Sequence, residues 1–174
     1  MSFKDKIQQP RMILRIFLVL ILIATAFFIL LVWNTARIRT VDVSEATLVT
    51  EQGDYEWEIE KIETPRGRHL HYDIAGWCIK TGEDQVALTL HVVLKNERTD
   101  EYLMVPTRLS DRSEDEEPLS KKYDYTHCCF EASGVESSKL NFSEDTFDVY
   151  LLCKFNEDDE QILIDTGETL YAEN

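Results

Sequence analysis

Cysteine is the residue type in this chain whose chemistry is most definite. The 174 residues include four cysteines, all of which follow the N-terminal apolar stretch: Cys78, Cys128, Cys129 and Cys153. An even number permits two disulfides, in three connectivities, if the compartment is oxidising. Cys78 and Cys153 fall at inward positions of their predicted strands, so they either form a disulfide or are small buried apolar side chains. Adjacent Cys128 and Cys129 would bridge only with strain.

Aromatic side chains are the second group with possible binding chemistry. Trp57, Trp77 and the seven tyrosines offer ring faces on which a sugar can stack. The alternative for each ring is to pack in the core, which is the commoner use of a large aromatic side chain. Trp57 and Trp77 are therefore both candidate binding aromatics and candidate core residues.

Recognisable catalytic and metal-binding patterns do not occur in the sequence. The chain contains no G-x-S-x-G, H-E-x-x-H, G-x-x-x-x-G-K, G-x-G-x-x-G or C-x-x-C pattern. Two acidic loops, 110–122 and 156–161, lack the spacing of a calcium-binding EF-hand, which favours solvated loops. We expect no identifiable catalytic residue, metal ligand or cofactor, and an accessory protein is favoured over an enzyme.

Charge is unevenly distributed along the chain. Residues 1–39 contain six Lys or Arg and one acid, whereas the remainder contains twelve Lys or Arg and thirty-two acids, a net charge of 12 − 32 = −20. A domain this acidic repels the phosphate backbone of nucleic acids, so nucleic acid is not an expected partner. Basic protein surfaces and cations are better matched to it.

The N-terminal region predicts a membrane helix. Ile16 to Trp33 is a run of eighteen residues without a charged side chain, and a helix of this length covers about 27 Å, close to the ~30 Å hydrocarbon core of a bilayer. Basic residues dominate the segment before this run, which favours a cytoplasmic N-terminus. We predict a cytoplasmic tail at 1–12, a transmembrane helix at 13–33, a linker at 34–40 and an extracytoplasmic domain at 41–174.

A cleavable signal peptide is the competing interpretation of the same segment. Ala24-Thr25-Ala26 resembles a signal peptidase site. Cleavage after Ala26 would leave seven apolar residues, 27–33, at the new N-terminus, whereas an uncleaved helix buries them in lipid. The sequence therefore favours a retained signal anchor and a single-pass protein of the cell membrane.

After residue 40 the hydrophobic pattern alternates with a period of two. This period is typical of strands that bury one face, and no amphipathic helical pattern interrupts it. The pattern predicts an all-β domain of seven or eight strands, an immunoglobulin-like antiparallel β-sandwich with an open barrel as the alternative. Nine segments carry the pattern from which these seven or eight strands are expected, near 41–49, 55–60, 69–76, 86–94, 102–109, 124–131, 147–155, 161–165 and 168–172.

Residues 74–170 resemble a small β-sandwich module of Gram-positive bacterial membrane proteins associated with surface polysaccharides. The similarity rests on a Gly-Trp opening strand, a tyrosine leading to an Arg and Asp turn, an aromatic after the central loop and a closing Thr-Gly hairpin: Gly76-Trp77, Tyr102 to Asp111, Phe130 and Thr166-Gly167. The resemblance implies an extracytoplasmic accessory module with membrane proteins or glycans of the cell surface as partners. A membrane-tethered hydrolase of cell-surface polymers is the alternative function.

The predicted topology can be tested on intact cells. Because the basic flank keeps the N-terminus inside, protease added to spheroplasts should digest the domain after residue 40 and leave a membrane-protected fragment. Mass spectrometry of that fragment should find residues 1–26 still attached. Protection of the domain would contradict the orientation, and a mature chain starting at Phe27 would show that the segment is cleaved.

Overall fold

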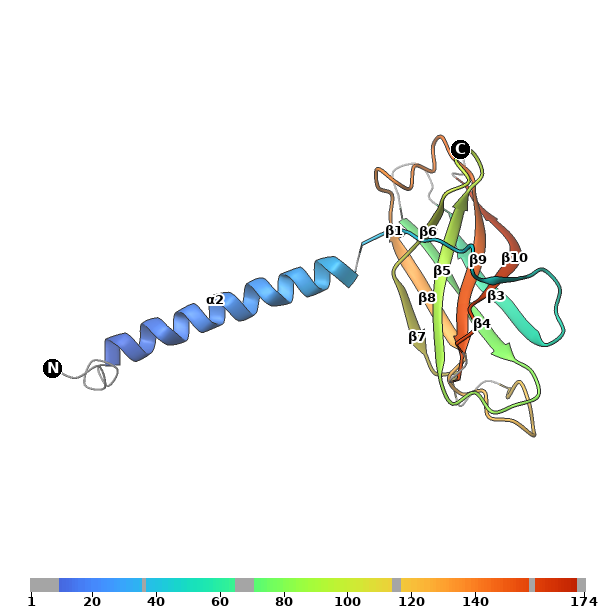
Figure 1. Cartoon of the computed structure of the whole chain (residues 1–174), viewed down its shortest axis with the longest axis horizontal. Coiled ribbons are helices and arrows are strands. Elements are labelled where there is room, and N and C mark those ends of the chain that lie inside the picture. Colours follow the sequence, from blue (N-terminus) through green and yellow to red (C-terminus); the bar gives the residue numbers. More distant parts are fainter. Residues whose placement is uncertain (1–9, 36, 65–70, 114–116, 157–158, 172–174) are drawn as a thin grey trace. The chain divides into compact units, whose positions relative to one another are not determined.

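The protein consists of a helix and a β domain that follow each other along the chain (Figure 1). A computed structural model describes residues 10–35, 37–64, 71–113, 117–156 and 159–171. Two compact units are present, one ending at Arg37 and the other beginning at Ile38. The predicted start of the domain at residue 41 is three residues later, because Ile38 already packs against the core of the β domain.

Helix α2 spans Pro10–Thr35, a few residues longer at each end than the predicted 13–33. Proline suits the first position of a helix because its missing N–H has no intrahelical partner there. The stretch Ile13–Leu30 is long and apolar enough to cross a membrane, and all of its side chains are exposed. This helix is a candidate membrane span or signal anchor.

The described residues of the β domain form ten strands in two sheets. Six strands form one sheet in the order β1-β6-β5-β9-β10-β2, and four form the other in the order β3-β4-β8-β7. The described strand pairs are antiparallel apart from β10 with β2, which is parallel. The bounds are β1 Arg39–Thr40, β2 Thr47–Val49, β3 Tyr55–Glu63, β4 His71–Lys80, β5 Leu88–Asn96, β6 Tyr102–Met104, β7 Thr107–Ser110, β8 Cys129–Val135, β9 Phe147–Phe155 and β10 Ile162–Leu170.

The strand count exceeds the predicted seven or eight partly because 102–109 is not one strand. It divides into β6 in the six-stranded sheet and β7 in the four-stranded sheet. Pro106, at the crossing, has no N–H to donate to a ladder. The Thr107 hydroxyl fixes the bend, since Oγ1 accepts from the Val92 N–H at 2.9 Å and donates to the Val105 carbonyl at 3.0 Å.

The C-terminal segment differs from the prediction in the opposite way. The strands expected at 161–165 and 168–172 are the single strand β10, and the expected Thr-Gly hairpin is an irregularity within it. The register against β9 shifts between Asp165 and Thr169. Gly167 has a φ of 74°, which glycine adopts without steric cost, so the strand bulges and then continues.

The core lies between the two sheets and contains side chains from both. The described residues predicted to face inward along β3, β4, β5 and β9 pack in or against the core, although Val86, expected to face inward, precedes β5 and is 79% exposed. Asp73, expected on the solvated face of β4, is 8% exposed. The sheets are thus packed face to face in a sandwich-like arrangement. The inward side chains include Trp57, Tyr72, Ile74 and Cys78 from the four-stranded sheet, and Leu90, Val92, Leu94, Phe147, Val149, Leu151, Cys153 and Phe155 from the six-stranded sheet.

Both sheets also carry apolar side chains on their outer faces. Residues 41–46, which we call the strap, link β1 at one edge of the six-stranded sheet to β2 at the other (Figure 1). Val41, Val43 and Ala46 of the strap pack against Tyr150 and its neighbours on that sheet. The described part of the β7–β8 loop, residues 111–113 and 117–128, packs in the same way against Trp77 and Ile79 on the outer face of the four-stranded sheet.

Replacing Trp57 tests the contribution of the core. The ring is 8% exposed between the sheets, so Trp57→Ala should cost about 3–5 kcal/mol of unfolding free energy through lost burial and a cavity. Thermal or urea unfolding of the full chain in mild detergent measures the loss. Glu58→Ala, at the neighbouring exposed position, is the control and should change stability little. An unchanged melting temperature in Trp57→Ala would contradict the packing described here.

Candidate functional site

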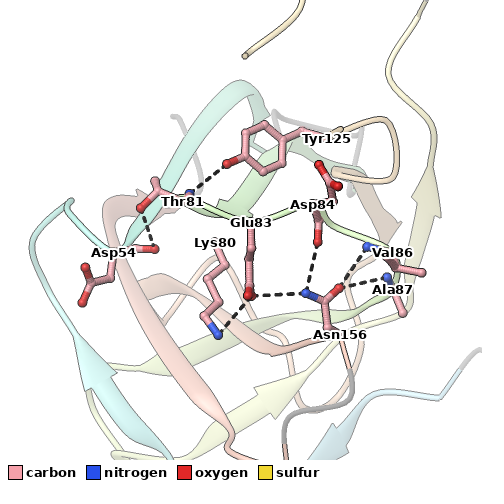
Figure 2. A network of polar contacts seen from close by, with 10 residues as sticks. Asp54, Lys80, Thr81, Glu83, Asp84, Val86, Ala87, Tyr125 and Asn156 are labelled. Atoms are coloured by element: carbon pink, nitrogen blue, oxygen red, sulfur yellow. Dashed lines mark hydrogen bonds and ion pairs between the residues drawn. The ribbon is translucent and has the colours of Figure 1, made fainter. Parts of the chain in front are cut away.

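Several connections meet at one end of the β domain and are held together by a hydrogen-bond network (Figure 2). Asn156, at the end of β9, is its centre. Its side-chain oxygen accepts from the Val86 N–H at 2.9 Å and the Ala87 N–H at 3.3 Å. Its amide nitrogen donates to Glu83 Oε1 and to the Asp84 carbonyl, both at 3.2 Å. Asn156 thereby fixes the whole β4–β5 turn.

The same network extends to two further segments. Thr81 donates its backbone N–H to the Asp54 carbonyl at 2.9 Å, which links the β4–β5 turn to the residues before β3. The Gly82 N–H donates to Tyr125 Oη at 3.1 Å, which links it to the β7–β8 loop (Figure 2). Asn156 has a φ of 51°, a left-handed conformation that asparagine tolerates better than most residues.

The β7–β8 loop is also held by hydrogen bonds from Gln85 of the β4–β5 turn. Gln85 is 4% exposed, and its Nε2 donates to the His127 carbonyl at 2.7 Å while its backbone N–H donates to the Asp124 carbonyl at 2.8 Å. Trp77 and Ile79, on the outer face of β4, pack against Tyr125 and the adjoining part of the loop. These contacts position the side chains that the loop presents to solvent.

A groove of about 450 Å³ lies within this loop. Its walls combine hydroxyl groups, an aromatic pair, apolar side chains and two charged residues. We call it the loop groove. It is lined by Arg112, Ser113, Pro118, Leu119, Ser120, Tyr123, Asp124, Tyr125 and Thr126. Mixed apolar and hydroxyl walls of this kind suit a polar ligand that also has an apolar face, such as a sugar ring.

Tyr123 and Asp124 give the loop groove an aromatic ring and a hydrogen-bond acceptor. The rings of Tyr123 and Tyr125 have centroids 6.2 Å apart, and Lys122 Nζ lies 4.6 Å from the centroid of Tyr123. Hydrogen bonds from the Thr126 side chain and backbone hold the pKa of the Asp124 carboxyl below its ordinary value. Asp124 is therefore a carboxylate at neutral pH and accepts, but does not donate, hydrogen bonds.

A second groove, of about 330 Å³, lies beside β7. Its walls include the exposed apolar side chains of Val86 and Leu109 and the hydroxyl of Ser110. His127 Nδ1 lies 2.5 Å from Asp111 Oδ1. Ser110, Asp111 and His127 all line this groove, and serine, histidine and aspartate are the residue types of a hydrolase triad. We call this the edge groove, and note that the His127 and Asp111 side chains are 57% and 65% exposed.

A third groove, of about 650 Å³, lies between the strap and the β5–β6 turn. Two of its acidic side chains are engaged within the protein. Asp42 accepts from the Ser44 N–H at 2.9 Å, which helps to lower the pKa of its carboxyl, and Asp100 pairs with Lys95 at 3.0 Å.

The structure places the sequence-predicted residues in different surroundings. Trp57 and Trp77 are each 8% exposed, so neither presents a ring face to solvent. Trp57 packs between the sheets, and Trp77 supports the β7–β8 loop. Cys78 and Cys153 face each other across the core with their Sγ atoms 4.0 Å apart. No disulfide joins any of the four cysteines, all of which are described.

Sequence reasoning missed the groups that line the grooves. Tyr123 was one of seven candidate tyrosines and was not singled out, Asp111 was placed in the acidic loop 110–122, and Asp124 and His127 were placed in the strand predicted at 124–131. A signal was available for the Asp111–His127 pair, because strands predicted at 102–109 and 124–131 form a hairpin if they pair. The observed pairing of Ser110 with Cys129 places Asp111 and His127 near each other at its open end.

Comparisons of this chain with family models, with curated proteins and with solved structures found no match.

Replacing Asn156 tests the network that holds this end of the domain. Asn156→Ala removes its side-chain hydrogen bonds, which should cost about 1 kcal/mol. It also puts alanine, which tolerates the left-handed region less well than asparagine, at positive φ, which costs up to about 1–2 kcal/mol more. Asn156→Gly is the matched control, since it loses the same bonds without the backbone penalty. Urea unfolding should rank the chains wild type, Gly, then Ala. Equal stability of the two variants would contradict the backbone contribution.

Proposed function

We propose that this chain is a single-pass membrane protein whose β domain lies outside the cytoplasm and binds a cell-surface polysaccharide as an accessory module. The observation that carries the proposal is the loop groove, with its tyrosine pair and hydroxyl groups, on a domain that begins three residues after a helix of membrane-spanning length. Because so few residues connect the helix to the domain, the domain would act at the membrane surface.

The composition of the loop groove supports a glycan over other ligands. Ser113, Ser120 and Thr126 supply hydroxyl groups, and Asp124 supplies a carboxylate that accepts from sugar hydroxyls. Tyr123, which is only partly buried, supplies a ring for stacking. The acidic character of the whole domain disfavours nucleic acid and strongly anionic polymers.

The immunoglobulin-like type of sandwich and the relationship to polysaccharide-associated modules are part of the same proposal. Two antiparallel-rich sheets that enclose one core support the first. Gly76, Trp77 and Phe130 support the second through the resemblance noted in the sequence. Gly76 lies so close to β3 that a Cβ added there would be 2.1 Å from the Glu58 carbonyl oxygen, so the Gly-Trp pair also has a structural role.

A membrane-tethered hydrolase is the second candidate. The observation that favours it is the Asp111–His127 contact beside Ser110 in the edge groove. A hydrolytic role needs Nε2 of the same imidazole to take a proton from the attacking hydroxyl. The high exposure of both Asp111 and His127 leaves the pair open to water, which favours the binding function over this one.

Binding by the loop groove can be measured with purified cell-surface polysaccharide and the full chain in nanodiscs. Tyr123→Ala should weaken binding about tenfold, because an aromatic contact contributes about 0.5–1.5 kcal/mol beyond its buried area. Tyr171→Ala is the matched control, since Tyr171 is 49% exposed and does not line the groove. It should bind like the wild type.

The same preparation separates the two candidate functions. Shortening of the polysaccharide by the wild type, abolished in His127→Gln and Ser110→Ala, would replace the binding proposal with the hydrolase. Equal affinities of wild type and Tyr123→Ala would contradict the assignment of the loop groove.

A further inference from the structure

Two pairs of thiols lie within contact distance in the β domain. Cys78 Sγ, on β4, is 4.0 Å from Cys153 Sγ on β9, and each side chain is at most 1% exposed. Cys128 Sγ is 3.8 Å from Cys129 Sγ, and Cys129 is only partly buried. The distances alone do not distinguish the pairs, but their backbone geometry does.

Backbone geometry disfavours a bond between the adjacent cysteines. Cysteines joined by a disulfide usually have Cα atoms about 4.4–6.8 Å apart, whereas neighbours such as Cys128 and Cys129 are held at about 3.8 Å by a trans peptide. Cys78 and Cys153 have no such restriction, because they come from strands in different sheets, 75 positions apart in the chain.

We propose that Cys78 and Cys153 form a disulfide that joins the two sheets, and that it closes before the core packs around it. The inference rests on the proposed placement of the domain outside the cytoplasm, where thiols are oxidised. The two thiols together lose two protons and two electrons. The electrons pass to the disulfide of a thiol–disulfide oxidoreductase, which becomes a dithiol as the Cys78–Cys153 bond forms.

The timing follows from burial. Thiol–disulfide exchange requires a thiolate that the partner can reach, and burial in the core raises the pKa of Cys78 well above its ordinary value. Trp57 is paired with Cys78 along β3, and Leu90 is paired with Cys153 along β5. Once these side chains pack, neither sulfur is accessible to an oxidoreductase. The same packing then protects the bond from reductants.

Thiol labelling of the full chain, extracted from native membranes in mild detergent, tests the bond. After denaturation, an alkylating reagent should add two labels without reduction and four labels after reduction, as counted by intact mass. Cys78→Ala should take three labels with or without reduction, because Cys153 loses its partner. Cys129→Ala is the matched control and should take one label before reduction and three after it.

Labelling after denaturation does not require any variant to be stably folded. Four labels in the unreduced wild type would overturn the proposal, and so would peptide mapping that joins Cys78 or Cys153 to Cys128 or Cys129. If external protease digests the domain but the unreduced chain still takes four labels, the disulfide proposal fails. The proposed location and function are not contradicted by that result.

Resistance to reduction tests the order of events. Dithiothreitol added to the folded chain should leave the bond intact, and added denaturant should make reduction fast. Reduction in denaturant should then lower the melting temperature of the refolded chain by about 10 °C or more, because the bond closes a long loop. Rapid reduction under native conditions would overturn the conclusion that the core seals the bond.

Discussion

Apolar side chains on both faces of both sheets are the constraint on which this structure depends. A sheet in a two-layer domain needs only one apolar face, yet Tyr150 and Leu163 lie on the outer face of one sheet and Trp77 and Ile79 on the outer face of the other. Each outer face must be covered, because exposing that much apolar surface to water costs free energy. The strap and the β7–β8 loop cover these side chains. The β7–β8 loop is the longer of the two, and its own side chains line the loop groove.

Periodicity in the sequence was sufficient to predict the parts of the fold that depend on one strand at a time. Alternation along β9 identified Phe147, Val149 and Leu151 as inward residues, and they are buried. Pairing between distant strands was not predictable in this way. The parallel pairing of β2 with β10 joins residues more than a hundred positions apart, and nothing in 47–49 specifies that partner. The crossing at Pro106 was likewise hidden, since a proline in a strand pattern indicates an edge as readily as a change of sheet.

The candidate site was less predictable than the fold for a related reason. Trp77 was selected by residue type, but its position on a covered face made it a support for the loop that presents Tyr123. The groove depends on how residues 117–128 return over the sheet, and this is set by contacts such as that of Gln85 Nε2 with the carbonyl of His127. Glutamine carries no sequence signal for such a role, because the same residue is common on exposed surfaces.

The strap also has a consequence for the order in which the chain can fold. Ribosomes make residues 41–46 long before β9 and β10, which provide Tyr150, Leu152 and Leu163 for the strap to cover. The strap can meet Val93, Tyr102 and Met104 earlier, but its docking surface is complete only when β10 has been synthesised. β1 can pair with β6 before then, whereas β2 has no strand partner until β10 exists. The six-stranded sheet therefore completes late, and truncation of β10 would leave β2 without its partner.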